Sequence, residues 1–423
     1  MHNYYTEKVN FYGSTTPHEL IKQFGSPLYV YNEAILRQRC REMAGFIQYS
    51  NYKANYSTKA NANLELLKIV HEEGLHADAM SPGEIYVLLA AGFHPEEIFY
   101  IGNNVSEEEM LYAVNLGIPV SVDSLSQLDT FGEINPGGKV AIRINPGIGA
   151  GHNEKVITGG KKTKFGINPD RIKDIEAILK KYNLNLIGIN QHIGSLFMEG
   201  DVYLESVKTI LTIAACFEGL QFIDLGGGFG IPYHKQEKEE PLELVQFGRR
   251  IGELLSDWAA GGNPDILFKI EPGRYITAEC GILLGTVHAL KENSGICYAG
   301  TDLGFNTLVR PVMYDSWHDV EVYSKNPLNF PEEKSYTIVG NICESGDIMA
   351  RERKLPSLSK GDVLGIMDAG AYGYSMSSNY NNRLRPAEVL IGTGGKPRLI
   401  RRRDTLEDLL RNFCSDPLPA GRW

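Results

Sequence analysis

The feature that most constrains the fold of this 423-residue chain is one pattern repeated between Tyr52 and Arg274. In each repeat, a short apolar run is followed by a small or polar turn and then by a segment with helical periodicity. Strands that alternate with helices are typical of parallel βαβ units. We therefore expect eight parallel strands, at Lys53–Thr58, Leu75–Ala79, Ile98–Ile101, Pro119–Val122, Val140–Ile144, Leu186–Gln191, Phe222–Leu225 and Ile266–Ile270.

Helical patterns follow the first seven of these strands. Their apolar residues recur three and four positions apart, as in Leu64, Leu67 and Val70. Eight such units favour a closed (β/α)8 barrel of the TIM type. The alternative is an open, doubly wound sheet. The clearest helices are expected at Leu64–Glu73, Glu84–Ala91, Glu107–Leu116 and Leu242–Trp258.

After Ala278 the alternation of strands and helices ends. Short strand-like runs follow one another there without long helical segments between them. We expect a barrel over residues 34–279 and a mainly β domain over 280–423, with residues 1–33 joining the β domain through a strand at Leu28–Tyr31. The strand-like runs are Ile282–Val287, Asp319–Val322, Tyr336–Val339 and Val363–Met367.

Composition and charge exclude several classes of protein. The hydrophobic content of 43% and charged content of 22% are ordinary for a globular domain, and the net charge of −10 argues against binding nucleic acid or an anionic membrane. We find no secretion signal and no apolar stretch near the roughly 20 residues that span a bilayer, so we expect a cytoplasmic protein. The six cysteines show no CxxC spacing, which predicts free thiols and no metal site.

Polar residues and glycines stand where most of the expected barrel strands end. In barrel enzymes the chemistry lies at the carboxyl ends of the strands. One lysine, one histidine, a glycine loop and an acid–arginine pair suit a phosphate-bearing aldehyde cofactor. The residues at these ends are Lys59, Asp78, Arg143, His192 with Ser195, Gly226 to Gly230, and Glu271 with Arg274.

Each of these residues also has a plainer interpretation. A buried Lys59 would be neutral enough to form a Schiff base, but a surface lysine is the alternative. The loop Gly226–Gly228 allows backbone N–H groups to approach an anion, or is only a tight turn. Glu271 suits a pyridine nitrogen, which it would keep protonated, or pairs with Arg274. His192 stacks on a flat ring or satisfies a hydrogen bond in the core.

The expected β domain adds three further groups. Cys343–Asp347 places a thiol and two acids in five residues, and Arg310 with Tyr314 would make a clamp for a carboxylate. Tyr372 stands among small residues in Ala369–Gly373, which suits close approach to a ligand. Each of these groups alone is a weak signal, and the Cys343–Asp347 segment has a plainer interpretation as a turn.

Taken together and in this order, the motifs resemble the fold type III pyridoxal-phosphate decarboxylases, which have the alanine-racemase fold. The resemblance runs from about Pro27 to Arg403. The motifs are Tyr56-Ser-Thr-Lys59-Ala-Asn61, His192-Ile-Gly-Ser195, Gly226-Gly-Gly-Phe-Gly230, Glu271-Pro-Gly-Arg274, Cys343-Glu-Ser-Gly-Asp347 and Gly370-Ala-Tyr-Gly373. Within this group the chain is most similar to the diaminopimelate decarboxylases, through Thr158-Gly159, Lys164–Gly166, Arg310–Asp315 and Ser378–Asn381.

The resemblance implies a role for each matching residue. Lys59 would hold pyridoxal 5'-phosphate as a Schiff base, and Cys343 would protonate the substrate after CO2 leaves. His192 would stack on the ring, Glu271 would bond its nitrogen, and the phosphate would lie at the glycine loop. The implied cofactor residues are Lys59, Asp78, Arg143, His192, Ser195, Gly226, Gly227, Gly228, Glu271, Arg274 and Tyr372, and the implied substrate residues are Arg274, Arg310, Tyr314, Glu344 and Tyr372.

The activity that the resemblance implies is decarboxylation of meso-2,6-diaminopimelate to L-lysine and CO2, the last step of lysine biosynthesis. It also implies a homodimer in which Cys343 and Glu344 reach the neighbouring subunit's site. Three alternatives stay open. They are a sister decarboxylase acting on ornithine, lysine, arginine or a conjugated amino acid, a racemase on the same fold, and a non-catalytic cofactor-binding homologue.

Overall fold

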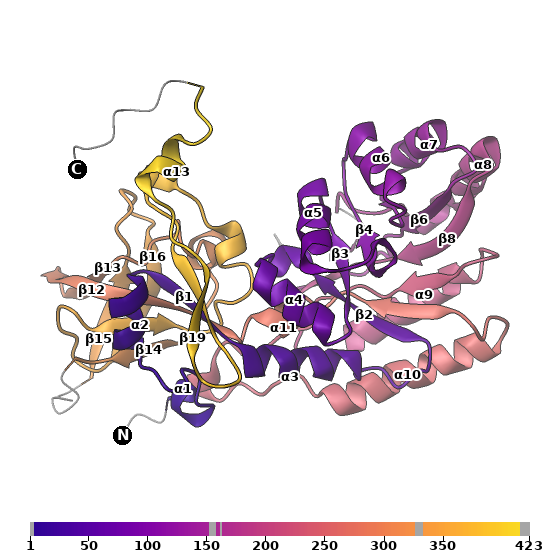
Figure 1. Cartoon of the computed structure of the whole chain (residues 1–423). Helices are drawn as coiled ribbons and strands as arrows, with labels where there is room; N and C mark the ends of the chain where they lie inside the picture. The colour runs from indigo at the N-terminus through magenta and orange to yellow at the C-terminus, as the bar shows by residue number, and fades with distance from the viewer. Residues whose placement is uncertain (1–3, 152–157, 161–162, 326–332, 415–423) are drawn as a thin grey trace. The chain divides into compact units, whose positions relative to one another are not determined.

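The computed structural model describes residues 4–151, 158–160, 163–325 and 333–414 (Figure 1). The chain divides into two compact units, Ala34–Glu279 and the combination of Met1–Glu33 with Cys280–Trp423. All six cysteines are free thiols. Across the described ranges, no helix is both long enough and apolar enough to span a bilayer.

The Ala34–Glu279 unit is built around eight parallel strands. Their order is β4-β3-β2-β11-β10-β8-β6-β5, and a parallel bridge between Tyr100 and Val120 joins the two ends of this path. The ring is therefore closed, which confirms the expected barrel and rules out the open sheet. The strands are β2 (Tyr52–Ser57), β3 (His76–Ala79), β4 (Ile98–Tyr100), β5 (Ser121–Val122), β6 (Lys139–Arg143), β8 (Asn185–Asn190), β10 (Phe222–Asp224) and β11 (Leu267–Ile270).

Helices follow the first seven of these strands and pack side by side around them (Figure 1). Several begin at a serine whose hydroxyl accepts a hydrogen bond from the third helical N–H, as Ser81, Ser106 and Ser124 do. The helices of this unit are α3 (Glu33–Ala44), α4 (Leu64–Glu72), α5 (Pro82–Ala91), α6 (Glu107–Asn115), α7 (Leu125–Ile134), α8 (Ile172–Tyr182), α9 (Asp201–Ala214), α10 (Leu244–Ala260) and the short α11 (Arg274–Thr277).

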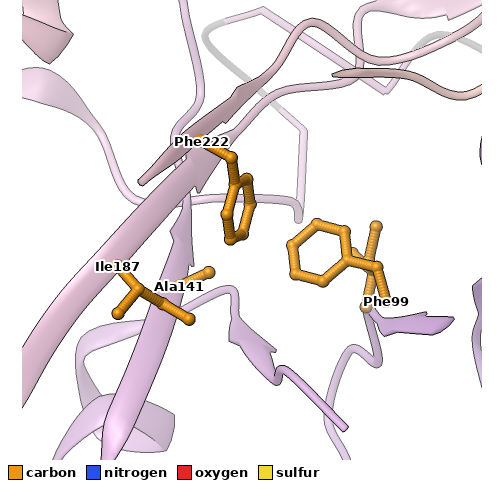
Figure 2. Packing of buried hydrophobic residues seen from close by; sticks show 5 residues of the cluster. Phe99, Ala141, Ile187 and Phe222 are labelled. Atoms are coloured by element: carbon orange, nitrogen blue, oxygen red, sulfur yellow. The ribbon is translucent and has the colours of Figure 1, made fainter. Parts of the chain in front are cut away.

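An apolar cluster fills part of the barrel interior (Figure 2). Phe99 on β4 and Phe222 on β10 meet edge to face, with ring centroids 5.1 Å apart. Because β4 and β10 are four places apart in the ring, their side chains can touch only through the interior. Ala141 and Ile187 complete the labelled part of this cluster. Asp224 lies two residues after Phe222, so the strand pleat points it into the same interior.

The second unit is a mixed sheet. In it β1 (Leu28–Asn32) lies between β12 (Gly281–Asn293), to which it is antiparallel, and β18 (Ala387–Ile391), to which it is parallel. The expected mainly β architecture with an N-terminal strand is thus confirmed. The other strands are β13 (Ile296–Thr301), β14 (Val320–Tyr323), β15 (Lys334–Val339), β16 (Ile348–Leu355), β17 (Val363–Ile366) and β19 (Pro397–Arg401), and the helices are α1 (Tyr5–Lys8), α2 (Pro17–Phe24), α12 (Arg310–Tyr314) and α13 (Leu406–Leu410).

The strands β13, β16, β18 and β19 were not among the expected strands. In β16, the charged residues Arg351 to Lys354 interrupt the apolar pattern, and most of them are exposed. Likewise β12 runs on to Asn293 through an exposed hairpin arm, well past the apolar stretch that ends at Val287. Pairing with a neighbour, rather than burial, defines the charged part of β16 and the outer arm of β12, and apolar patterning does not detect such pairing. The missed strand β18, by contrast, is fully buried.

We expect Phe222→Ala to destabilise the barrel unit by about 3–5 kcal/mol, because it removes a buried ring and leaves a cavity. Differential scanning calorimetry or urea unfolding measures this change. The matched control is Phe413→Ala, whose ring is 68% exposed and whose loss should change stability by about 0.5 kcal/mol or less. Equal effects of the two substitutions would contradict the assignment of Phe222 to the barrel core.

Candidate active site

Most of the residues expected at the strand ends of the barrel lie together. The backbone N–H of Gly227 donates to Nδ1 of His192 over 3.1 Å, and this nitrogen lies 3.6 Å from Oε2 of Glu271. Nη2 of Arg274 donates to Oγ of Ser195 over 2.9 Å. The positive charge of Lys59, which follows β2, acts on Glu271 and His192. The structure therefore brings these side chains to one end of the barrel.

In the glycine loop after β10, neighbouring backbone atoms lie so close that a side chain would not fit. A Cβ atom at Gly226 would lie 2.2 Å from the carbonyl oxygen of Gln191, and one at Gly227 would lie 1.9 Å from that of Glu271. Gly226 also has a φ of +76°, which favours glycine. The Gly226 N–H donates to Asp224 and the Gly227 N–H to His192. These two N–H groups are thus used inside the barrel, and an anion near the loop needs other donors.

The hydrogen bond from Gly227 identifies the tautomer of His192. Since Nδ1 accepts the backbone N–H, the ring proton of neutral His192 is on Nε2. Burial lowers the pKa of His192 well below its usual range, and the charges of Lys59 and Arg143 lower it further. His192 is therefore neutral, and its 3.6 Å separation from Glu271 is not an ion pair.

Three buried carboxyl groups lie near one another in the barrel. Burial raises the pKa of Asp78 to about 6 and that of Asp224 to about 7, although Lys59 opposes the first shift and the Gly226 N–H opposes the second. Burial also raises the pKa of Glu271 well above its usual range, and the negative charges of Asp224 and Asp78 add to this effect. The cluster thus holds its carboxylates at a high electrostatic cost and favours a nearby cation.

One cation already lies in the barrel interior. Lys269 on β11 is paired in register with Asp224, and its Nζ lies 4.4 Å from the ring centre of Phe222. Burial lowers the pKa of Lys269, and the charges of Asp224 and Glu271 oppose this shift. Lys269 therefore lies between the apolar cluster and the carboxyl groups.

The polar atoms at this end of the barrel fit pyridoxal phosphate. Among the described residues, the buried atoms Oε1 of Glu271, Oδ1 of Asp78 and Nη2 of Arg143 have no hydrogen-bond partner. Buried polar atoms are normally paired, so such a group of atoms points to a missing ligand. A carboxyl oxygen suits a protonated ring nitrogen, and Lys59 suits an aldehyde. The residues therefore fit this cofactor chemically.

In the second unit, Cys343 and Glu344 lie in the loop between β15 and β16 and are held by two residues of the Ser378–Asn381 motif. The side chain of Asn381 accepts from the Cys343 N–H over 3.0 Å and donates to its Sγ over 3.2 Å. The hydroxyl of Tyr380 donates to Oε1 of Glu344 over 2.6 Å. Both Cys343 and Glu344 are exposed in the chain as described. The loop therefore presents a thiol and a carboxylate whose positions are defined by side-chain contacts.

The other predicted residues of this unit lie elsewhere in it. Arg310 begins α12 and is 1% exposed, while Tyr314 ends the same helix and is partly exposed. Tyr372 follows β17 in a loop, with a φ of +56° that is uncommon for a residue with a side chain. Arg310 and Tyr314 therefore lie at the two ends of one short helix, four residues apart.

Some residues of these sites were not among the sequence predictions. Asp224 stands two residues before the glycine loop, and Lys269 stands two residues before Glu271. Both occupy inward positions, so the strand alternation could have identified them. Tyr233, whose hydroxyl accepts from Nη1 of Arg274 over 2.9 Å, gives no such signal. Tyr380 and Asn381 were noted only as part of a motif.

Asp224 should make the cofactor-free protein less stable as the pH rises. Its folded pKa, about 7, is above the ordinary 3.8. The stability that protonated Asp224 contributes is therefore complete below about pH 4 and is lost as the pH rises through 7. Asp224→Asn should remove part of this loss, of the order of a few kcal/mol, while the exposed Asp257→Asn should not. Thermal unfolding from pH 4 to 8 measures this, and an unchanged slope in Asp224→Asn would contradict it.

Comparisons with known proteins identify the family of the chain. Residues 33–278 match the family model described as the pyridoxal-binding domain of pyridoxal-dependent decarboxylases. The diaminopimelate decarboxylase of Methanothermobacter thermautotrophicus is 44% identical over 93% of this chain and 92% of its own length. That of Escherichia coli K12 is 34% identical over 92% and 94%.

Solved structures give the same result. The crystal structure of Helicobacter pylori diaminopimelate decarboxylase complexed with L-lysine superposes with a TM-score of 0.85 at 31% identity, covering 94% of this chain and 98% of that one. A Vibrio vulnificus lysine/ornithine decarboxylase shares the fold at a TM-score of 0.76 and 21% identity. From the family model and these near full-length matches, we conclude that the chain belongs to the pyridoxal-dependent decarboxylases and, within them, to the diaminopimelate decarboxylase family.

Proposed function

We propose that this protein is a pyridoxal-phosphate-dependent enzyme that decarboxylates meso-2,6-diaminopimelate to L-lysine and CO2 and so completes lysine biosynthesis. The observation that carries the proposal is the buried carboxyl group of Glu271, which lies at the same barrel end as Lys59 and has an oxygen without a partner among the described residues. The 44% identity to a diaminopimelate decarboxylase supports the choice of substrate.

The barrel residues would hold the cofactor. When bound, pyridoxal phosphate supplies a protonated ring that withdraws electrons from the substrate carbon. Glu271 keeps the proton on the ring nitrogen, and the neutral imidazole of His192 packs against the ring. Ser195 and Arg274 bind the phosphate together, because the Gly226 and Gly227 N–H groups are already used. Lys59 provides the amine that attaches the cofactor.

Further residues complete the cofactor contacts. Asp78 lies beside Lys59 and accepts from Oγ of Ser57 over 2.6 Å, so it holds a negative charge near the Lys59 amine. Arg143 offers Nη2 to an acceptor on the ring or its substituents. Gly228 leaves room beside the phosphate, and the Tyr372 hydroxyl bonds it. These roles predict that the cofactor is held through many weak contacts besides the covalent one.

Residues of the second unit would recognise the substrate. Arg310 and Tyr314, helped by Arg274, bind the carboxylate at the far end of the substrate, and Tyr372 contacts the substrate as well. Glu344, hydrogen-bonded to Tyr380, accepts from the distal ammonium. The Sγ of Cys343, held by Asn381, delivers a proton to the substrate carbon after CO2 leaves. The enzyme is a homodimer in which Cys343 and Glu344 serve the partner's site.

Product analysis tests the proposal. The purified protein, loaded with pyridoxal phosphate, is incubated separately with meso-diaminopimelate and with the L and D forms of lysine and ornithine. We expect L-lysine and CO2 from diaminopimelate and no product from the others. Turnover of lysine or ornithine instead would assign the enzyme to a sister decarboxylase. No turnover with an intact cofactor spectrum would reject the decarboxylase assignment for this panel.

Arg310→Ala should lower kcat/KM for diaminopimelate by about 30-fold or more, because truncating one partner of a buried charge pair costs about 2–5 kcal/mol. The affinity for pyridoxal phosphate, measured from its absorbance, should stay the same. Arg310→Lys keeps the charge but loses the two-pronged geometry, so we expect an intermediate loss. Equal losses of activity and of cofactor affinity would reject the clamp role.

Mixing two inactive variants tests the shared sites. Lys59→Ala and Cys343→Ala would each be nearly inactive as homodimers. Statistical exchange of subunits places one intact site in each mixed dimer, so the mixture should regain about a quarter of the normal activity. Subunit exchange is followed by analytical ultracentrifugation of tagged chains. A dimeric mixture that exchanges subunits yet stays inactive would show that each site belongs to a single chain.

A further inference from the structure

The guanidinium group of Arg310 is held inside its own unit by two side chains. Its Nη1 donates to Nε2 of His318 over 3.0 Å, and its Nη2 donates to Oγ of Ser316 over 3.3 Å. Arg310 and His318 are each 1% exposed. A buried arginine of this kind has little freedom to turn, because both of its terminal nitrogens donate to a side chain of the same unit.

The contacts of His318 leave one assignment for its ring proton. Arginine is only a hydrogen-bond donor, so Nε2 of His318 must accept from Arg310. The ring proton is therefore on Nδ1, which donates to the carbonyl oxygen of Met367 over 2.7 Å. Met367 directly follows β17, so this hydrogen bond joins the imidazole to the backbone at the end of a sheet strand. A chain of hydrogen bonds thus runs from the sheet through His318 to Arg310.

We propose that His318 is a positioning residue for substrate recognition, which orients the Arg310 guanidinium toward the distal carboxylate of the substrate. This inference rests on the proposed function, since it needs a substrate with a second carboxylate. The neutral His318 ring accepts from Nη1 without adding a charge of its own. Its bond to Met367 fixes the plane of the imidazole and, through it, the plane of the guanidinium.

The chemistry of the reaction provides a second ligand for the same clamp. Loss of CO2 from one end of diaminopimelate leaves the carboxylate at the other end in place, so L-lysine keeps the group that Arg310 would bind. Cadaverine has the same chain and no carboxylate. Inhibition by L-lysine therefore reports on the clamp, and inhibition by cadaverine reports on the rest of the pocket.

Two amide substitutions separate the two hydrogen bonds of His318. In His318→Gln the side-chain oxygen reaches the place of Nε2 and can still accept from Arg310, but the bond to Met367 is lost. In His318→Asn the side-chain nitrogen takes the place of Nδ1 and can still donate to Met367, but the acceptor for Arg310 is lost. If His318 only anchored the end of the strand through Met367, His318→Asn would be less damaging than His318→Gln.

We expect His318→Asn to raise KM for diaminopimelate and the inhibitory concentration of L-lysine roughly tenfold or more, since a hydrogen bond to a charged group is lost. Its kcat and its inhibition by cadaverine should stay within about threefold of the unmodified enzyme. In His318→Gln, KM, kcat and the inhibitory concentrations of L-lysine and cadaverine should all stay within about threefold of those of the unmodified enzyme. Cofactor absorbance and the thermal midpoint of each holoenzyme report on folding.

Equal damage in both variants, or greater damage in His318→Gln, would overturn the proposal. If His318→Asn does not fold, Ser316→Ala removes the hydroxyl that accepts from Nη2 of Arg310 and should raise KM several-fold with kcat retained. An unchanged KM would overturn the proposal as well. A failure of the proposed function is visible separately, because the unmodified enzyme would then release no lysine from diaminopimelate. In that case the clamp has no second carboxylate to bind, and both conclusions fall.

Discussion

The balance of charge inside the barrel is the constraint on which the candidate site depends. Asp78, Asp224 and Glu271 are buried within a few residues of the strand ends, and each pKa is raised chiefly by burial. Burying carboxylates is costly unless cations or hydrogen bonds compensate them. Lys269 compensates Asp224 from the apolar side, and the charge of Lys59 compensates Asp78 and Glu271. A cationic ring nitrogen placed against Glu271 completes this balance, which explains why the site suits a protonated cofactor.

The parallel barrel was predictable from the sequence because both faces of its strands are covered. Strands such as β8 and β10 are almost wholly buried and read as short apolar runs between turn residues. The strand-end residues were predictable for the same reason, since a polar side chain directly after an apolar run stands out. In β16 and in the outer part of β12 the pattern is lost, because exposed charged residues alternate with little apolar material.

The partners of the site residues could not be predicted from local patterns. His318 stands eight residues after Arg310, and Asn381 stands 38 residues after Cys343, so each contact depends on how the loops fold. Strand alternation places Lys269 on the same face of β11 as Glu271, but it does not predict that Nζ of Lys269 lies over the ring of Phe222 on the neighbouring strand. Register and loop geometry determine these contacts, and neither follows from the type of a single residue.

The central claim is that Lys59, facing the buried carboxyl cluster, attaches pyridoxal phosphate. The most direct test is reduction of the loaded protein with borohydride, followed by peptide mapping by mass spectrometry. The account predicts one reduced phosphopyridoxyl group per chain, on the peptide that contains Lys59, and no labelling of that peptide in Lys59→Ala. Stoichiometric labelling of another lysine, such as Lys269, in the unmodified protein would contradict it.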